Sequence, residues 1–240
     1  MAVYRLIKEP VFPDPREAEP EGLLAVGGDL GPERLLNAYS MGIFPWFNEG
    51  DPILWWSPPE RALILPGREH LGSRTRRALR CADFEVKADT AFERVIERCA
   101  RIPRPGQPGT WITDAMMEAY TGLHRAGFAH SIETWREGEL LGGLYGISLG
   151  AAFFGESMFS DRDYASRAAF AGLCGIAWAW GFHFIDGQLP NANLMQLGAI
   201  TIPRREYLAR LAQAMALPTR WGRWVLESQG GQGARCSAIE

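Results

Sequence analysis

Signals for export, membrane insertion and disulfide bonding are missing from this sequence. Its start, MAVYRLIKEP, has no apolar run between a basic residue and a cleavage site, and no later segment approaches about 18 consecutive apolar residues. The four cysteines lack C-x-x-C spacing, which argues against a zinc knuckle and against a disulfide framework. We therefore expect a globular protein of the cytoplasm, where thiols stay reduced.

The short motifs of several common enzyme classes are also missing. The chain contains no H-E-x-x-H, no G-x-S-x-G, no Walker loop and no G-x-G-x-x-G. These absences argue against a metalloprotease, an α/β-hydrolase and a nucleotide hydrolase. No ligand spacing connects the four histidines, which are His70, His124, His130 and His183. We expect them to be structural, because metal sites use closely spaced ligands.

The sequence has almost no excess of acidic over basic residues, since its formal net charge is only -3. A chain with this charge is not expected to coat nucleic acid non-specifically, although it has room for a local basic patch. Four arginines lie close together, at Arg74, Arg76, Arg77 and Arg80. They predict a helix that faces RNA phosphates, with a merely solvated helix face as the equal alternative.

Composition divides the chain into three parts, a small N-terminal domain at 1–63, a larger domain at 64–227 and a frayed polar tail at 228–240. Residues 22–60 are dense in Gly, Pro and Trp. Within them, Pro32 favours the first turn of a short helix and Gly42 favours its end. The segment 102–109, IPRPGQPG, is expected to be a loop.

Beyond residue 66 the apolar pattern becomes regular enough to predict helices and strands. Helical spacing extends from Thr113 to about Arg125, from Tyr164 to Trp180 and from near Arg204. Thr90 and Glu93 have the spacing of a capping box ahead of another helix. Between 129 and 159 the pattern changes to antiparallel strands, with a tight turn at Glu137-Gly138.

Polar residues interrupt two apolar strands. Glu156 lies among apolar residues, where a carboxylate is costly unless it meets a cation or hydrogen-bond donors, so a functional role is favoured over a structural salt bridge. Asp186 ends the run FHFID, and Gln188 follows after one residue. Strand alternation would direct both side chains to one face, where they would relay hydrogen bonds. A loop-capping Asp beside a solvated Gln is the equal alternative.

Aromatic residues gather in segments that are rich in Gly and Pro and are expected to be loops. They are Phe44, Trp46, Phe47, Trp55, Trp56 and Trp111. Such rings hold the ends of single-stranded RNA by stacking, at about 1–3 kcal/mol per base. The alternative, which is favoured for most of these rings, is that they attach a small domain to a larger one.

Long segments between residue 12 and about residue 207 resemble the bacterial leucyl/phenylalanyl-tRNA-protein transferase family. They are EGLLAVGGDL at 21–30, AYSMGIFPWF at 38–47, PILWWSPPERA at 52–62, GTWIT at 109–113, GGLYG at 142–146, GESMFS at 155–160 and IDGQ at 185–188. The resemblance implies an α+β protein, with a small N-terminal domain packed on a larger domain related to the N-acetyltransferase fold. It also implies acyl transfer without a metal, a cofactor or a covalent intermediate.

The same resemblance implies the partners of the protein. The donor is an aminoacyl-tRNA charged with Leu, Phe or Met, and the acceptor is a protein with N-terminal Arg or Lys. Transfer marks the acceptor for degradation by the N-degron route. We expect a monomer that has no membrane partner.

Roles for individual residues follow from their positions in the matching segments. Asp186 and Gln188 match the pair that relays a proton from the acceptor amine, and Glu156 matches the active-site carboxylate. A basic acceptor would be neutralised by Glu156 and Asp186. The expected substrate-binding residues are Trp46 and Trp111 near the terminal adenosine, Phe153, Met158 and Tyr120 around the amino-acid pocket, and Tyr39 and Asn191 as further candidates.

The chain departs from the family pattern at Gly31, Arg167, Gly187, Asn193 and Gln196. Asn193 stands where His is frequent, which bears on the geometry beyond Gln188 and on the pH dependence. Two other functions stay open on the residues alone. One is an acyl-CoA-dependent N-acyltransferase, which needs a backbone loop around pyrophosphate ahead of a helix. The other is a non-catalytic module that binds the end of a tRNA.

Overall fold

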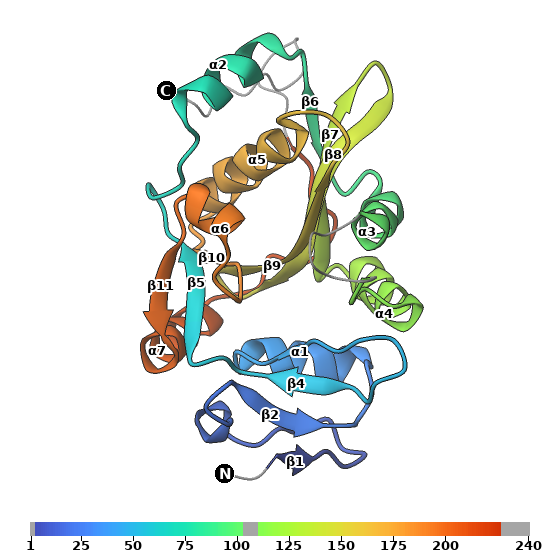
Figure 1. Ribbon diagram of the computed structural model, residues 1–240, viewed down its shortest axis with the longest axis vertical. Coiled ribbons are helices and arrows are strands. Elements are labelled where there is room, and N and C mark those ends of the chain that lie inside the picture. The colour runs from blue at the N-terminus through green and yellow to red at the C-terminus, as the bar shows by residue number, and fades with distance from the viewer. Residues whose placement is uncertain (1–2, 103–109, 227–240) are drawn as a thin grey trace.

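A computed structural model of the protein describes residues 3–102 and 110–226. Its described strands form a small N-terminal sheet and a seven-stranded sheet in the larger region (Figure 1). This arrangement confirms a mixed α+β protein with a small N-terminal region beside a larger one. The predicted tail at 228–240 and nearly all of the predicted loop at 102–109 lie outside the described residues.

The described residues of the N-terminal region form a sheet in the strand order β1-β2-β4-β3 and one α-helix. Its elements are β1 (Tyr4–Arg5), η1 (Pro15–Glu17), β2 (Leu23–Val26), α1 (Pro32–Ser40), β3 (Phe44–Pro45) and β4 (Leu54–Trp56). As predicted, Pro32 stands in the first turn of α1, and Gly42 follows its end with φ of 76°. The prediction that Phe44, Trp55 and Trp56 lie in loops is wrong, since they belong to β3 and β4.

The larger region is built on a sheet in the order β11-β5-β10-β9-β8-β7-β6. Its strands are β5 (Glu60–Ile64), β6 (Glu85–Ala88), β7 (Ala129–Arg136), β8 (Glu139–Leu149), β9 (Ala152–Ser160), β10 (Phe184–Asp186) and β11 (Ile200–Pro203). Its helices are α2 (Ser73–Cys81), α3 (Phe92–Arg101), α4 (Asp114–Arg125), α5 (Ala165–Ala179), α6 (Ala192–Gln196) and α7 (Arg204–Met215). Among the described pairs of this sheet, β9 and β10 are parallel and the others antiparallel.

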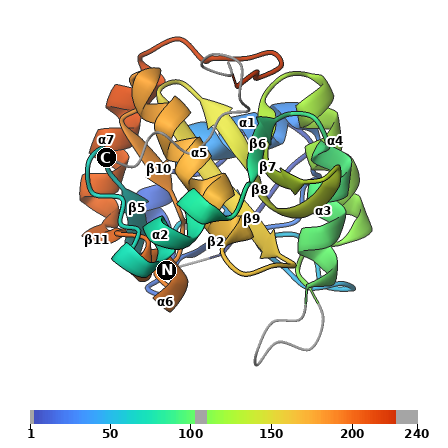
Figure 2. The ribbon, with the colours of Figure 1, turned by 90° about the horizontal axis from the view of Figure 1, so that it is seen from above.

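Helices cover both faces of the larger sheet. The apolar helix α5 packs on β6, β7, β8 and β9, whereas α3 and α4 pack on the opposite face (Figure 1). Figure 2 shows α3 and α4 on one side of the molecule and α7 with β5 and β11 on the other. Helix α1 contacts α4 and β8, and it lies between the N-terminal sheet and the larger region. Because α5 joins the parallel strands β9 and β10, the whole of β10 pairs with the first three residues of β9, and β9 continues beyond the end of β10.

Most of the predicted local structure is confirmed. The helices expected near 113, 164 and 204 are α4, α5 and α7, and Thr113 caps α4 by accepting a hydrogen bond from the Met116 amide at 3.3 Å. The turn between β7 and β8 contains Glu137 and Gly138, with φ of 52° and 80°. Both residues are in the left-handed region, as a two-residue hairpin turn of this type requires.

The predicted capping box at the start of α3 is wrong. The N-cap residue is Ala91, and Glu93 instead pairs with Arg125 at 2.7 Å. The buried carboxylate of Glu133 on β7 accepts from the amides of Thr90 and Ala91 at 3.1 and 3.2 Å. A negative charge at a helix N-terminus is favourable wherever it comes from, so a neighbouring strand replaces the local cap.

Candidate active site

A cavity of about 560 Å³ opens beside the middle of β9 and the C-terminal end of β10, between the sheet, α5 and α6. Its apolar lining includes Leu144, Phe153, Met158, Phe170, Leu173 and Ile185. Its polar lining includes Glu156, Asn191 and Asn193. The cavity therefore combines an apolar interior with a few polar groups, which is typical of a site that binds a small apolar group in one orientation.

Glu156 is held at this cavity by a bulge in β9. Tyr145 of β8 pairs with Ser157 and Gly146 pairs with Gly155, so Glu156 is the extra residue between them. A bulge of this kind redirects a side chain without ending the strand. The position of the Glu156 carboxylate thus depends on the register of two strands.

Three donors surround the Glu156 carboxylate. Tyr39 of α1 donates at 2.7 Å, Gln188 donates through Nε2 at 2.7 Å, and Tyr120 of α4 donates at 3.2 Å. The hydroxyls of Tyr39 and Tyr120 are also in close contact with each other. Two hydroxyl protons cannot supply all three contacts among Tyr39, Tyr120 and Glu156, whereas a proton on Glu156 supplies the third.

The environment of Glu156 favours this extra proton. Burial raises the pKa of the Glu156 carboxyl to about 7, although hydrogen bonds from Tyr39, Tyr120 and Gln188 act to lower it. Burial also raises the pKa of both tyrosines, so their hydroxyls stay protonated. Glu156 can therefore exchange a proton near neutral pH, as a general base must.

Asp186 is buried at the end of β10 and is already paired. Arg61 of β5 donates to both its oxygens at 2.8–3.0 Å, and Tyr207 of α7 donates at 2.7 Å. The guanidinium of Arg61 lies between the rings of Phe44 and Tyr207, 4.8 and 4.4 Å from their centroids. The charge of Asp186 is thus neutralised within the protein.

The predicted same-face arrangement of Asp186 and Gln188 is wrong. Strand β10 ends at Asp186, and Gln188 has φ of 62°. Gln188 therefore lies outside the strand, and the alternation of side chains along a strand does not determine where it points. Asp186 instead accepts a hydrogen bond from the backbone amide of Gln188 at 2.7 Å. This contact holds the turn that directs the Gln188 side chain to Glu156.

The structure brings only some of the predicted substrate-binding residues to the cavity. Phe153, Met158 and Asn191 line it, and Asn191 also caps α6. Tyr39 and Tyr120 are buried behind it, where they contact Glu156. Among the residues that the structure describes, the rings of Trp46 and Trp111 are not part of the cavity lining. Trp46 lies against Trp56 at 5.8 Å, at the surface of the N-terminal region.

Three of the departures from the family pattern contact one another at the rim of the cavity. Arg167 donates to the side-chain oxygens of Asn193 at 2.8 Å and of Gln196 at 3.5 Å. Asn193 also donates to the sulfur of Met158 at 3.4 Å. These three residues therefore form one connected group, which reaches the cavity directly at Asn193 and also through the contact of Asn193 with Met158.

The four arginines predicted to contact phosphates lie on α2, at the end of the larger region remote from the N-terminal sheet (Figure 1). Arg74, Arg76, Arg77 and Arg80 are all exposed, whereas Leu79 is buried. Within the described part of the chain, none of the four forms an ion pair with an acidic side chain. Their charges are available to a partner.

Sequence reasoning missed Arg61 and Tyr207, which hold Asp186. The signal that pointed to Glu156, a charged residue among apolar strand residues, is also present at Arg61 in the run ERALI. In the described residues no group of three or more His, Cys, Asp and Glu side chains forms a metal site. No helix in the described ranges has the length and apolarity needed to cross a membrane.

Comparisons with known proteins point to one family. Residues 63–212 match the family model described as leucyl/phenylalanyl-tRNA protein transferase, and residues 28–59 match the model of its N-terminal domain. A protein called leucyl/phenylalanyl-tRNA--protein transferase in Anaeromyxobacter dehalogenans strain 2CP-C is 56% identical over 232 residues, which are 96% of this chain and 99% of that protein. A protein with the same name in Myxococcus xanthus strain DK1622 is 54% identical over 227 residues, which are 94% of this chain and 97% of that protein.

Similarities to solved structures are remote. L-PGS from Bacillus licheniformis matches with a TM-score of 0.37 and 12% identity, over 70% of this chain and 54% of that one. A GCN5-related N-acetyltransferase-like protein from Streptococcus suis matches with a TM-score of 0.33 and 12% identity, over 67% and 59% of the two chains. At these TM-scores the likeness supports no conclusion about chemistry.

Proposed function

The chain belongs to the leucyl/phenylalanyl-tRNA-protein transferase family and is an aminoacyltransferase, and from this we propose that transfer takes place in the cavity beside Glu156. One observation carries the proposal. A carboxylate whose pKa burial raises to about 7 lies at the edge of an apolar cavity, held by donors from α1, from α4 and from the turn after β10. Groups with such shifted pKa values are frequent at catalytic sites.

The apolar cavity is proposed to take the side chain of the donor amino acid. Phe153 and Met158 belong to its walls, and Leu, Phe or Met would each bury apolar surface there. Each missing methylene costs about 1–3 kcal/mol in discrimination, so small donors would be used poorly. Met is included among the proposed donors because the family resemblance implies it, and its unbranched thioether is compatible with an apolar cavity.

The acceptor amine is proposed to meet Glu156 and Gln188. Gln188 uses Nε2 to bind Glu156, and within the described residues its side-chain oxygen has no partner, so that oxygen can accept from the amine. The amine nitrogen attacks the ester carbonyl, a C–N bond forms, and the C–O bond to the terminal ribose breaks. Glu156 takes a proton from the amine and returns it to the ribose oxygen as that oxygen leaves, so the carboxylate ends the step unchanged.

Other parts of the reaction need no strong catalyst. The aminoacyl ester is already activated, and the α-amine has an ordinary pKa near 8, so part of it is neutral near pH 7. Positioning of the amine against the ester therefore supplies much of the rate. Asp186 acts in this scheme by holding the Gln188 turn, because Arg61 already neutralises its charge.

The wider role of the protein is proposed from the same family. The acceptors would be proteins with N-terminal Arg or Lys, which transfer would direct to degradation by the N-degron route. The tRNA would contact the arginines of α2, and its terminal adenosine would stack on Trp46 and Trp111. The protein would act as a monomer, without a cofactor, in the cytoplasm, where thiols such as those of Cys81 and Cys174 would stay reduced.

A transfer assay tests this function directly. Labelled Leu on its tRNA is mixed with the protein and a peptide that begins with Arg, and the peptide is analysed for an added Leu. We expect transfer to the Arg and Lys peptides and little to a matched peptide that begins with Ala. Acetylation of the peptide from acetyl-CoA would identify an N-acyltransferase instead. Tight binding of the charged tRNA without transfer would identify a binding module.

A further inference from the structure

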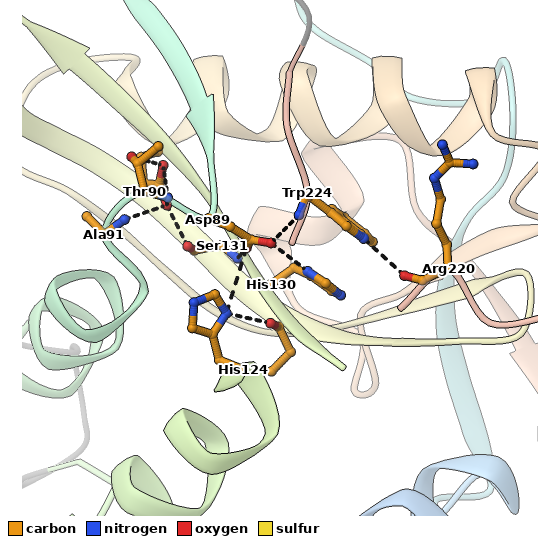
Figure 3. A network of polar contacts seen from close by, with 10 residues as sticks. Asp89, Thr90, Ala91, His124, His130, Ser131, Arg220 and Trp224 are labelled. Atoms are coloured by element: carbon orange, nitrogen blue, oxygen red, sulfur yellow. Dashed lines mark hydrogen bonds and ion pairs between the residues drawn. The ribbon is translucent and has the colours of Figure 1, made fainter. Parts of the chain in front are cut away.

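After α7 the chain runs back across the larger region as an extended segment, residues 217–226, here called the C-terminal strap. Three separate turns bind it. The Gly150 amide donates to the Thr219 hydroxyl at 2.9 Å, and the Gly222 amide donates to the Gly127 carbonyl at 2.9 Å. The Trp224 amide donates to Asp89 at 2.7 Å (Figure 3). The strap is therefore an integral part of the fold.

Trp224 anchors the strap in the core. Its side chain is 2% exposed and stacks on His130, with ring centroids 3.9 Å apart and planes 8° apart (Figure 3). The Asp89 oxygen that accepts from the Trp224 amide also contacts His130 Nδ1 at 2.8 Å, so one carboxylate holds both residues. The indole Nε1 of Trp224 donates to the Arg220 carbonyl at 3.1 Å, and the Trp180 ring meets it edge-on at 4.9 Å.

The same indole contacts a wall of the cavity. The centroid of its ring lies 5.8 Å from that of Phe153, which is fully buried and lines the cavity. On the β8 side Phe153 lies against Gly146, where an added Cβ would come within 2.7 Å of two ring atoms. The ring of Phe153 is therefore in contact with Gly146, which has no side chain, and with the indole of Trp224.

We infer that Trp224 is a positioning residue for donor selection, because it fixes the ring of Phe153 and thereby the depth of the cavity. The inference depends on the proposal that the cavity takes the donor side chain. Trp224 lies outside residues 63–212, which match the family model, and it reaches the site only through Phe153. Through Trp224, the C-terminal strap thus influences which donor amino acid the cavity accepts.

Removing the indole leaves space behind Phe153. Because protein cores relax only partly around a lost ring, Phe153 gains freedom to move away from the cavity. The cavity then accommodates larger donors with less strain, while the groups that meet the acceptor amine stay in place. Trp224→Leu should therefore change which donor is preferred more than it changes the use of the acceptor.

The experiment measures kcat/KM for Leu and Phe carried on one tRNA body, with an Arg-initiated peptide as acceptor. For Trp224→Leu we expect the Phe-to-Leu ratio to rise about threefold or more, while the KM for the peptide stays within about twofold. Thr219→Ala is the matched control. It removes another bond that holds the strap but leaves the contact between Trp224 and Phe153, so its ratio should equal that of the wild type.

Unchanged donor ratios in folded Trp224→Leu would overturn the inference, and so would an equal change in Thr219→Ala. If Trp224→Leu does not fold, Trp224→Phe is measured instead. It keeps a ring against His130 but is smaller, so a rise of about twofold in the ratio is expected and an unchanged ratio refutes the inference. Failure of the wild-type protein to transfer either donor would refute the proposed function itself.

Discussion

Glu156 combines burial with three hydrogen bonds, so its protonation state should control the reaction. If it accepts the amine proton, transfer by the wild-type protein should increase as the pH rises through about 7, where Glu156 loses its proton. Glu156→Gln should lower the single-turnover rate by roughly a hundredfold and remove this step from the pH profile. The measurement is the single-turnover rate between about pH 5.5 and 9. A step near pH 7 that survives in the variant would assign it to another group.

Peptide choice separates two roles for Glu156. A proton acceptor serves every amine, so Glu156→Gln should reduce kcat/KM for Arg-, Lys- and Ala-initiated peptides by the same factor. A loss confined to the Arg and Lys peptides would instead mean that Glu156 recognises the basic side chain of the acceptor.

The same pKa shift has a consequence for stability. The native state holds a proton on Glu156 that the unfolded chain releases near pH 4.5, so this group favours the native state at low pH. The contribution is lost as the pH rises through about 7. Glu156→Gln should therefore raise the Tm more at pH 8 than at pH 5, as measured by thermal unfolding.

Substitutions of Asp186 and of Gln188 should have different effects on the free energy of unfolding. Asp186→Asn leaves the buried guanidinium of Arg61 without its charge partner, and losing one member of such a pair costs about 3–5 kcal/mol. Gln188→Ala removes only a contact at the cavity and should leave the free energy of unfolding almost unchanged. Both should lower single-turnover transfer by about tenfold or more, while affinity for charged tRNA stays within a few-fold.

Urea unfolding and single-turnover transfer provide the two measurements. Equal stability of Asp186→Asn and the wild type would show that the ion pair with Arg61 does not hold the fold. Near-normal transfer by folded Gln188→Ala would remove Gln188 from the site.

At the scale of single elements, the arginines of α2 are the charged group that we expect to bind tRNA. Its arginines are exposed, and in the described residues they have no acidic partners, so contact with tRNA phosphates would release counterions. Replacing Arg76 and Arg77 by Ala should weaken tRNA binding and reduce the slope of log affinity against log salt concentration by about one to two, because up to two phosphate contacts are lost. Donor preference should not change, because α2 contributes no residue to the cavity lining.

The matched control replaces Arg16 and Arg210, which are also accessible but lie on other elements and pair with Asp14 and Glu206. The measurement is tRNA affinity between about 50 and 200 mM salt. If the α2 variant and the wild type have the same salt slope, the arginines of α2 face solvent and do not contact the tRNA.

At the scale of the whole molecule, the N-terminal region supplies one side chain to the candidate site. Tyr39 of α1 reaches from that region to the Glu156 carboxylate at 2.7 Å, and its hydrogen bond acts to lower the pKa of Glu156. Tyr39→Phe keeps the ring and removes this donor. The step in the pH profile of transfer should therefore move to higher pH, and the rate at pH 7 should fall.

The pH profiles of Tyr39→Phe and Tyr120→Phe provide the comparison. The longer contact of Tyr120, at 3.2 Å, predicts a smaller shift in that variant. A Tyr39→Phe profile identical to that of the wild type would mean that the N-terminal region has no part in tuning Glu156.

Local features of the sequence determined much of the fold. Helices α4, α5 and α7 and the turn at Glu137-Gly138 were predicted because their signals, apolar spacing and turn residues, act between near neighbours in the chain. The motif segments identified the family, and the cost of a carboxylate among apolar residues singled out Glu156.

Only the tertiary structure decided the partners of the charged groups. Arg61 meets Asp186 across 125 residues of sequence, and Glu133 replaces the cap expected from Glu93. Gln188 turns toward Glu156 because a left-handed residue ends the strand alternation. A buried charge requires a partner, but which residue supplies it depends on how distant elements pack, and the one-dimensional pattern does not contain that information.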